Sequence, residues 1–405
     1  MKILVVCQHY WPENFRITEI CEALVQRGHQ VTALVGLPNY PSGVIPAEYR
    51  HFRNRHQVHN GVKIERCFEI GRRKGKVGLA INYVSYMTSA SLHALFHKRD
   101  FDVVYAYSTS PVLMSLPAAL LRCVCPKKLM IYVLDIWPAC LAAMNVGEDS
   151  LLYRFMKKVS KWVYSKADRL IYSSKRFQQY LKDVHGIQVS DQQYMPQFAD
   201  DIFLSPLPPK PWDDVANLVF AGNIGKVQAV EVLIQAAALL RDEPVKWHIV
   251  GDGSNYEDCV RLAKELHLDD RVHFYGRRPL EEMPTFYAMA DAMLVSMRDD
   301  ISVNDTLPGK VQSYMAAAKP VLGSIKGETA YVIDQAQCGF CAPPDDAEAF
   351  ANVVRKFLAR EDWQELGQNG RRYSDAHFTK KDHMDRLDAM LQALAGGNDD
   401  AGFSA

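Results

Sequence analysis

The chain has 405 residues, of which 48% are hydrophobic and 23% charged, a composition typical of a soluble globular enzyme and not of a disordered or fibrous chain. Lys and Arg together number 47, as do Asp and Glu, so no overall charge favours nucleic acid as a partner. The length exceeds one ordinary hydrophobic core, and we expect two domains of about 200 residues each.

The first half alternates apolar strands with amphipathic helices. It opens on a strand over Lys2–Cys7, a polar turn, a helix ending near Gln26 and a strand over Gln30–Leu34. Such a short strand–helix–strand unit implies a parallel pair with a right-handed crossover. Further strands are predicted over Val62–Arg66, Val103–Tyr107, Leu129–Leu134 and Arg169–Ser173, and helices over Leu79–His97, Val112–Cys123, Leu151–Ser165 and Lys175–Lys182. The first turn lacks a complete Gly-x-Gly-x-x-Gly fingerprint, which disfavours a nicotinamide cofactor.

A Pro-rich stretch over residues 193–212 predicts a stiff connection between domains. The alternation resumes at Leu218. Beyond the strand–helix–strand unit that starts there, strands are predicted over Val272–Tyr275, Ala292–Ser296 and Val321–Gly323, and helices over Tyr256–Leu266, Leu280–Ala288, Lys310–Ala318, Glu348–Arg360 and Trp363–Ser374. We therefore expect an N-terminal domain over 1–195, a second domain over 212–375, a C-terminal helix over 376–395 that packs back on the first domain, and a frayed tail over 396–405.

The sequence gives only weak indications of a membrane span, a metal site or disulfide bonds. Met1 and Lys2 lead directly into a core strand, so we expect no secretory signal. The uncharged run Val77–Phe96 carries several polar side chains and is interpreted as a soluble helix and not a membrane span. The nine cysteines are odd in number and scattered, as expected of free thiols in a reducing cytoplasm. Cys338 and Cys341 have the spacing of half a zinc site, but no second ligand pair completes it.

The most informative segment is Phe220–Val250, which is followed by Gly251-Asp252-Gly253. It reads as a strand, a Gly-rich turn, a helix and a second strand ending on another Gly-rich turn. Glycine permits close approach of the backbone to a ligand, and the helix N-terminus suits a phosphate. Ligands of doubly wound sheets bind outside the carboxyl ends of the strands, so two ligands are expected to meet in a cleft between the domains.

Several motifs then resemble one family when taken in order. They are Tyr132–Pro138 (YVLDIWP), Gly222–Gln228 (GNIGKVQ), Gly251-Asp252-Gly253, Phe274-Tyr275-Gly276, Leu307–Pro320 (LPGKVQSYMAAAKP), Gly327-Glu328 and Cys338-Gly339. Nearly the whole chain resembles a retaining glycosyltransferase of family 4, in the bacterial polysaccharide branch that includes the fucosamine transferase of O-antigen and capsule assembly. The resemblance implies the α/β GT-B fold, two Rossmann-like parallel-sheet domains facing a cleft. It also implies a nucleotide-diphosphate-sugar donor on the second domain and an acceptor on the first, without a cofactor or metal.

The resemblance also implies where the donor binds. The family holds the donor sugar and ribose with a spaced pair of glutamates, whose positions here carry Asp305 and Ser313. The second position has lost its carboxylate, and Glu328 is a candidate substitute. A loop acid and an ordinary helix residue are the structural alternatives. The complete set of expected donor contacts is Gly222, Asn223, Gly225, Lys226, Gln228, Gly251, Gly253, Arg277, Asp305, Ser313 and Glu328.

Three side chains are candidates for the chemistry. Lys310, at the start of a predicted helix, is placed to neutralise a diphosphate leaving group, unless it is a solvated surface lysine. The family's usual cations near the first glycine are replaced by Asn223 and Gln228, which leaves Lys226 and the backbone N–H groups around Gly225 for the phosphates. Asp135 and His9, each just beyond a strand, are candidates to orient or deprotonate the acceptor hydroxyl. A turn residue and a structural histidine are their alternatives.

A basic cluster, Arg72, Arg73, Lys74 and Lys76, precedes the predicted helix that carries Tyr83, Tyr86, Met87, Leu92 and Phe96. Cations beside an aromatic helix suit anionic lipid head groups, although a solvated loop fits the pattern almost as well. We expect a cytoplasmic, peripheral inner-membrane transferase that acts on a lipid-linked or oligosaccharide acceptor. A nucleotide-sugar epimerase of the same fold and a catalytically silent scaffold are the alternatives. The sugar, base, linkage and oligomeric state do not follow from the sequence.

Overall fold

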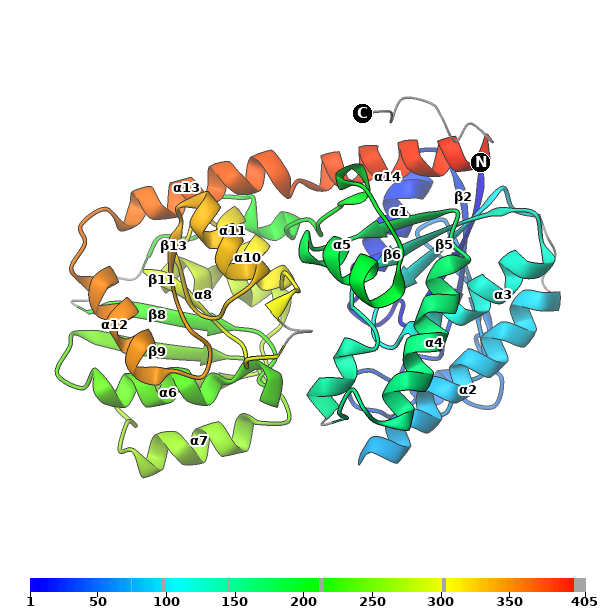
Figure 1. The fold of residues 1–405 in the computed structure, drawn as a ribbon. Helices are drawn as coiled ribbons and strands as arrows, with labels where there is room; N and C mark the ends of the chain where they lie inside the picture. Colours follow the sequence, from blue (N-terminus) through cyan, green and yellow to red (C-terminus); the bar gives the residue numbers. More distant parts are fainter. Residues whose placement is uncertain (74, 97–99, 145, 211–214, 301–303, 397–405) are drawn as a thin grey trace. The chain divides into compact units, whose positions relative to one another are not determined.

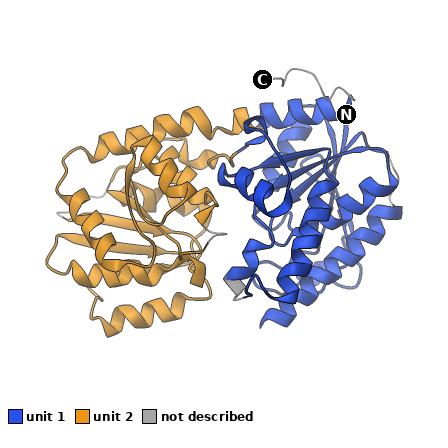
Figure 2. Cartoon of the chain, viewed as in Figure 1, with its two compact units in different colours: residues 1–195, 384–405 blue, residues 196–383 orange. Residues whose placement is uncertain are grey.

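The computed structural model describes residues 1–396 except 74, 97–99, 145, 211–214 and 301–303 (Figure 1). The chain divides into two compact units, residues 1–195 with 384–405 and residues 196–383 (Figure 2). Of the Pro-rich segment over 193–212, residues 193–195 belong to the first unit, and its described residues from Pro196 onward belong to the second. Among the described residues, no helix is both long enough and apolar enough to cross a membrane.

The first unit is built on a parallel sheet in the order β3-β4-β2-β1-β5-β6-β7, with β3 alone antiparallel to its neighbour. The strands are β1 (Lys2–Val6), β2 (Gln30–Val35), β3 (His56–His59), β4 (Val62–Arg66), β5 (Val103–Ser108), β6 (Lys128–Val133) and β7 (Arg169–Tyr172). The inner strands are continuous apolar runs because helices cover both faces of a parallel sheet. The sequence did not predict β3, because His56–His59 is short, polar and only partly buried.

The helices of the first unit are α1 (Ile17–Gln26), α2 (Gly75–Phe96), α3 (Leu116–Val124), α4 (Leu151–Ser165) and α5 (Arg176–Tyr180). One face of the sheet shares a single core with α2, α3 and α4. In α2, Tyr86, Ala90 and Ala94 recur at four-residue spacing and are fully buried in this core. The predicted helix over Val112–Cys123 begins as a short 3-10 turn, η2 (Val112–Ser115), which continues into α3.

The C-terminal helix α14 (Lys380–Ala395) returns to the first unit from Met384 onward. Arg27 bonds Asp385 at 2.7 Å, and His29 bonds Asp388 at 2.8 Å. Arg386 also donates to the carbonyl of Tyr194 at 2.6 Å. These polar contacts hold the helix against α1 and the last segment of the first unit. Of the tail expected to fray, residues 397–405 lie outside the described part.

The second unit has a parallel sheet in the order β10-β9-β8-β11-β12-β13. The strands are β8 (Ala216–Ala221), β9 (Val245–Val250), β10 (Val272–Gly276), β11 (Ala292–Ser296), β12 (Val321–Ser324) and β13 (Gly339–Ala342). The helices are α6 (Val230–Leu239), α7 (Tyr256–Glu265), α8 (Met283–Met289), α10 (Gly309–Ala316), α11 (Glu328–Ala336), α12 (Ala347–Leu358) and α13 (Trp363–His377). The sequence did not predict α11 and β13.

In each sheet, the strand order changes direction at one pair of neighbouring parallel strands. This pair is β1 and β5 in the first unit, and β8 and β11 in the second. Strand order moves outward in one direction from β1 and β8 and in the other from β5 and β11. The crevice outside the carboxyl ends of such a pair of strands is where open α/β sheets bind ligands. In each unit, this crevice is therefore the expected location of a ligand-binding site. The first unit presents the loops after β1, β5 and β6, and the second presents those after β8 and β11.

Candidate functional site

The turns after β8 and β9 bring two backbone segments into direct contact. The amide of Gly222 donates to the carbonyl of Val250 at 2.9 Å, and both Gly222 and Gly251 have positive φ, 148° and 139°. A Cβ on Gly251 would lie 1.8 Å from the carbonyl oxygen of Gly222. A Cβ on Gly253 would lie 2.4 Å from the carbonyl oxygen of Ile224. Only glycine permits this approach, so these residues set the shape of the turn at the sheet's crevice.

Lys310 lies at this point of the second unit. It is the second residue of α10, and its Nζ lies 3.9 Å from the centroid of the Phe220 ring on β8. A Cβ on Gly222 would lie 2.9 Å from the same Nζ. The residue as a whole is half-buried, but its Nζ is enclosed and has no hydrogen-bond partner among the described residues. Burial lowers the pKa of Lys310 to about 7. It is therefore not the solvated surface lysine that the sequence left open.

A second half-buried lysine, Lys319, illustrates a structural role in the same unit. Lys319 Nζ donates to the carbonyl oxygens of Ala290 at 2.8 Å and Ala288 at 3.3 Å. Buried polar groups in native proteins are almost always paired in this way. An enclosed ammonium without such partners is costly unless a ligand supplies the opposite charge. Lys310 therefore has the surroundings of a group that binds an anion.

The turn after Gly222 is held by its own amide side chains. Asn223 Nδ2 donates to Gln228 Oε1 at 3.0 Å, and the amide of Gly225 donates to the same oxygen at 3.1 Å. The amide of Ile224 is taken by the carbonyl of Asp252. The amides of Ile224 and Gly225 therefore already have partners within the turn, and a phosphate that used them would have to displace the Asp252 carbonyl and the Gln228 side chain. The Lys226 side chain is exposed.

Arg298, which the sequence did not single out, fastens this turn to the segment after β11. Its Nε donates to the carbonyl of Lys226 at 2.7 Å, and its guanidinium bonds Glu231 at 2.6 Å. Asn255 donates to the other oxygen of the Glu231 carboxylate at 3.0 Å. The turns after β8, β9 and β11 are thereby linked through one carboxylate. No local pattern predicts this link, because its members are far apart in the chain.

The family's paired acidic positions lie in two adjoining segments. Ser313 is buried in α10, and its Oγ donates to Asp200 Oδ2 at 3.0 Å. Asp200, which sequence reasoning missed, thus places a carboxylate beside Ser313, where the expected glutamate is absent. Asp305 is half-buried, and Glu328 is buried as the first residue of α11. The two are close in space, because Thr329 donates to the carbonyl of Thr306 at 3.2 Å. Arg277 is exposed just beyond β10.

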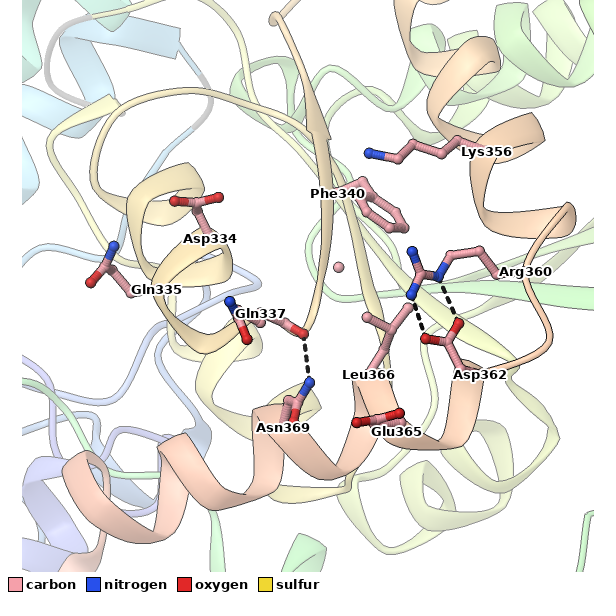
Figure 3. A pocket seen from close by; sticks show the side chains of 11 residues that line it. Asp334, Gln335, Gln337, Phe340, Lys356, Arg360, Asp362, Glu365, Leu366 and Asn369 are labelled. Carbon is pink, nitrogen blue, oxygen red and sulfur yellow. Dashed lines mark hydrogen bonds and ion pairs between the residues drawn. The ribbon is translucent and has the colours of Figure 1, made fainter.

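A pocket of about 630 Å³ opens elsewhere in the second unit, around the first residues of β13 (Figure 3). Its two cations already have partners. Lys356 Nζ lies 4.0 Å from the Phe340 ring centroid, and Arg360 forms two hydrogen bonds with Asp362. The pocket lies at the amino end of an edge strand, away from the crevice where open sheets bind ligands. We assign it no role.

In the first unit, His9 follows β1 and is oriented by a carboxylate. Its Nδ1 lies 2.8 Å from Glu13 Oε2, and its ring stacks on Phe15 at 4.7 Å. The other oxygen of Glu13 accepts from the amides of Asn39 and Tyr40, both at 2.6 Å. Glu13 accepts a hydrogen bond from Nδ1–H, so Nε2 is the ring nitrogen with a lone pair that can accept a proton. Glu13 was missed by sequence reasoning, although its spacing of four residues from His9 was visible.

A second carboxylate, Glu69, lies beneath this loop. It is 1% exposed and accepts hydrogen bonds from Gln8 at 2.7 Å, Asn39 at 2.9 Å and Asn82 at 2.6 Å. Burial raises the pKa of Glu69 to about 7, partly offset by these donors. The network joins the ends of β1, β2 and β4 to α2. It fixes the loop that carries Asn39 and Tyr40 beside His9.

Asp135 lies two residues beyond β6 and is half-buried. Burial raises its pKa to about 6, against a hydrogen bond from the backbone of Ser110 just after β5. The phenol of Tyr83 on α2 has its pKa raised first by burial and then by the charges of Asp135 and Glu69, while Arg72 lowers it. Tyr83 therefore lies within electrostatic reach of both acids. His9, Asp135 and Glu69 all lie at the carboxyl ends of the first unit's strands.

The His9–Glu13 pair gives a testable expectation. Glu13→Gln keeps an oxygen for the amides of Asn39 and Tyr40 but presents an NH2 group to His9 Nδ1, which must then accept. The ring proton moves to Nε2, which can no longer take a proton from an acceptor hydroxyl. We expect turnover to fall about 10²-fold with little change in melting temperature, since positioned general bases contribute on that order. A matched Glu22→Gln change on α1 should leave turnover unchanged. Equal turnover of the Glu13 variant and the parent across pH 6–9 would refute the role.

Comparisons with known proteins agree with this architecture. Residues 14–196 match the family described as "Glycosyl transferase 4-like domain", and residues 210–373 match "Glycosyl transferases group 1". Together these matches cover most of the chain. The chain therefore belongs to the glycosyltransferases built from these two domains. Its two Rossmann-like units have the GT-B fold.

Individual relatives are more distant. The probable glycosyltransferase WbjE of Pseudomonas aeruginosa is 26% identical, over 82% of this chain and 84% of its own. The putative colanic acid biosynthesis glycosyl transferase WcaI of Escherichia coli K12 is 21% identical, over 88% and 92%. The structure of Anabaena Alr3699/HepE in complex with UDP-glucose is 16% identical with a TM-score of 0.69, over 97% and 100%. At family level, the chain is a glycosyltransferase.

Proposed function

We propose that the chain is a retaining glycosyltransferase that moves a sugar from a nucleoside-diphosphate donor to a polysaccharide precursor. The observation that carries the proposal is the enclosed Nζ of Lys310 beside Gly222, at the reversal point of the second sheet, which has no hydrogen-bond partner in the described part of the chain. A diphosphate is the group that such a cation would neutralise. The UDP-glucose bound by the Anabaena structure supports the same class of donor.

The reaction we propose needs little covalent chemistry from the protein. The bond between the sugar's anomeric carbon and the diphosphate oxygen breaks, and the acceptor oxygen forms the new bond on the same face. The acceptor's hydroxyl proton goes to the departing phosphate, or first to Asp135 or His9. Lys310 stabilises the negative charge on the leaving group, and Asp305, Ser313 with Asp200, and Glu328 are proposed to hold the sugar and ribose.

The finer features rest on the resemblance and on relatives' names. We propose that the acceptor is lipid-linked and that the protein acts at the inner face of the cytoplasmic membrane. We also propose that it functions in O-antigen, capsule or exopolysaccharide synthesis and belongs to the fucosamine-transferase branch. Colanic acid synthesis, in the printed name of WcaI, supports the polysaccharide assignment. Because Lys310 can neutralise the diphosphate, we also propose that no metal is required, so turnover should persist in excess chelator.

A panel of sugar nucleotides tests the function. Purified protein is screened for thermal stabilisation, since a ligand that binds the folded state raises its stability. The donor that binds is then assayed for products. A transferase releases nucleoside diphosphate and free sugar slowly without acceptor, and faster with a polysaccharide precursor. A new sugar nucleotide would identify the same-fold epimerase instead, and binding without any product would identify the silent scaffold.

The lowered pKa of Lys310 predicts a proton linked to donor binding. In the empty protein the amine loses its proton above pH about 7, whereas a bound diphosphate favours the charged form. Binding should therefore take up a proton between about pH 7 and 10, and donor affinity should fall as pH rises through that window. Below pH 7 both states are protonated and no uptake is expected. Calorimetry in buffers of different ionisation enthalpy measures the uptake, and Lys310→Met should abolish it. No uptake at pH 8.5 by the parent protein would contradict the assignment.

A further inference from the structure

The first half of α4 exposes large apolar side chains to solvent. Leu151 is 84% exposed and Phe155 60%, and Leu152 between them is also exposed. Single exposed apolar residues are ordinary on protein surfaces, but a cluster at the start of one helix marks an interaction site. The opposite side of α4 is well packed in the core, through residues such as Met156 and Val163. The exposed cluster is therefore not a consequence of a poorly packed helix.

Positive charges follow the same helix. Arg154, Lys157, Lys158 and Lys161 are all exposed, and α4 contains no acidic residue. At about 100° per residue, these cations flank one side of the buried face and the apolar cluster flanks the other. The acids nearest in sequence, Glu148 and Asp149, precede the helix. The chain as a whole has a formal net charge of zero, so this stripe is a local concentration of charge.

A similar surface occurs at the start of α2. Val77 is 74% exposed, and Ile81 and Val84 continue an exposed stripe at helical spacing. Exposed Lys76 lies beside it, and exposed Arg72 and Arg73 precede the helix. Lys74 of the predicted basic cluster lies outside the described residues.

The prediction that an aromatic helix face accompanies these cations is wrong in part. Tyr86 is fully buried, and Tyr83 and Met87 are half-buried, because the helix turns these residues toward the sheet. Leu92 and Phe96 are exposed, but they lie at the far end of α2. The apolar side chains near the cations are instead aliphatic.

The two surfaces lie on one side of the first unit. Both α2 and α4 pack against η2 and contribute to the same core on one face of the sheet. In Figure 1 both helices begin toward the lower edge of this unit. Their exposed first halves therefore present apolar residues and cations in the same general region.

We propose that the first unit docks on an anionic lipid bilayer through the exposed first halves of α2 and α4. Interfacial helices of this kind insert apolar residues at the head-group boundary and place Lys and Arg near the phosphates. A second copy of the chain is the competing occupant, but lysines are depleted from protein–protein interfaces and are abundant here. Each cation near such a surface adds to the attraction, and the stripe of α4 alone carries four of them.

The position of this surface bears on the reaction. Tyr83, which is adjacent in sequence to Val84 of the exposed stripe of α2, is within electrostatic reach of Asp135 and Arg72. A docked bilayer would therefore lie near the residues proposed to receive the acceptor. This step rests on the proposed function, because it supposes an acceptor whose lipid remains in the membrane while its sugar reaches Asp135.

Sedimentation of the full-length protein with vesicles tests the proposal. Vesicles of phosphatidylcholine with phosphatidylglycerol are compared with phosphatidylcholine alone, at low and high salt. One variant changes Leu151, Leu152 and Phe155 to Ser, and a second changes Arg154, Lys157, Lys158 and Lys161 to Gln. Matched controls are Leu92→Ser with Phe96→Ser on the far end of α2, and Arg261, Lys264, Arg355 and Lys356 to Gln on the second unit. Donor binding by each variant, measured as thermal stabilisation, verifies folding.

We expect the parent to bind anionic vesicles and to lose binding as salt rises, because exposed charges are screened. Each α4 variant should bind at least tenfold more weakly, while the controls bind like the parent. Unchanged binding by both α4 variants would overturn the proposal. So would vesicle-independent self-association, seen by light scattering and abolished by the apolar variant, since this would identify a second copy as the occupant. Vesicle binding without any transfer activity would leave the docking surface standing and refute the proposed function.

Discussion

Lys310→Ala should reduce turnover by about two to three orders of magnitude under saturating donor, the loss expected when a group that stabilises a leaving charge is removed. The enclosed Nζ beside Gly222 and above the Phe220 ring is the basis of this expectation. The fold should not suffer, because Lys310 Nζ has no hydrogen-bond partner to lose among the described residues. Removing a buried, unpaired ammonium should raise the melting temperature of the empty protein. The measurements are kcat with saturating donor and a thermal melt without ligand.

Lys319 provides the matched control. It is also a half-buried lysine, nine residues further along the chain, but it donates to the carbonyls of Ala288 and Ala290. Lys319→Ala should lower the melting temperature, since two carbonyls lose their donor, and should leave kcat of the folded protein close to the parent value. A Lys310 variant with near-parent turnover, or one that behaves like the Lys319 variant, would show that Lys310 is structural.

The sequence predicted those parts of the fold that depend on local patterns. The inner strands of both sheets are apolar runs, and α4 was predicted with its observed bounds because its buried residues recur at helical spacing. The Gly-rich turns at Gly222 and Gly251 were recognisable because their chemistry is contained in a few consecutive residues. In contrast, β3 and β13 are edge strands of only four residues, too short for a periodic pattern to emerge.

The parts of the site that the sequence missed depend on contacts between distant residues. Asp200 reaches Ser313, and Arg298 joins Lys226 to Glu231, across 113, 72 and 67 positions of the chain. The burial of Lys310 Nζ is of the same kind, because it depends on β8 and on the turn after it. A sequence can show that a cation begins a helix, but not whether that cation lies in solvent or against Phe220. For the same reason, the predicted aromatic side of α2 included Tyr86, which the fold buries, and Tyr83, which it half-buries.

Asp135→Asn is expected to separate the acceptor step from donor binding. The change keeps the size of the side chain and can retain the hydrogen bond from the backbone of Ser110, but it removes the charge. If Asp135 accepts or orients the acceptor's proton, transfer should fall about 10²-fold, in line with the contribution of a positioned general base. Donor affinity should not change, because Asp135 belongs to the first unit and the donor is proposed to bind the second.

The pH dependence of transfer gives a second readout on the same residue. The pKa of Asp135 is raised to about 6 by burial, and a base acts in its ionised form, so transfer by the parent should rise with pH through about 6. The Asn variant should lose this acidic limb while its thermal stabilisation by donor stays equal to that of the parent. Transfer and donor binding that decline together in the variant would show that Asp135 supports the fold or the donor, and the acceptor role would then be wrong. Transfer that stays near the parent level in Asp135→Asn but falls about 10²-fold in a His9→Gln variant would assign the proton to His9 Nε2 instead.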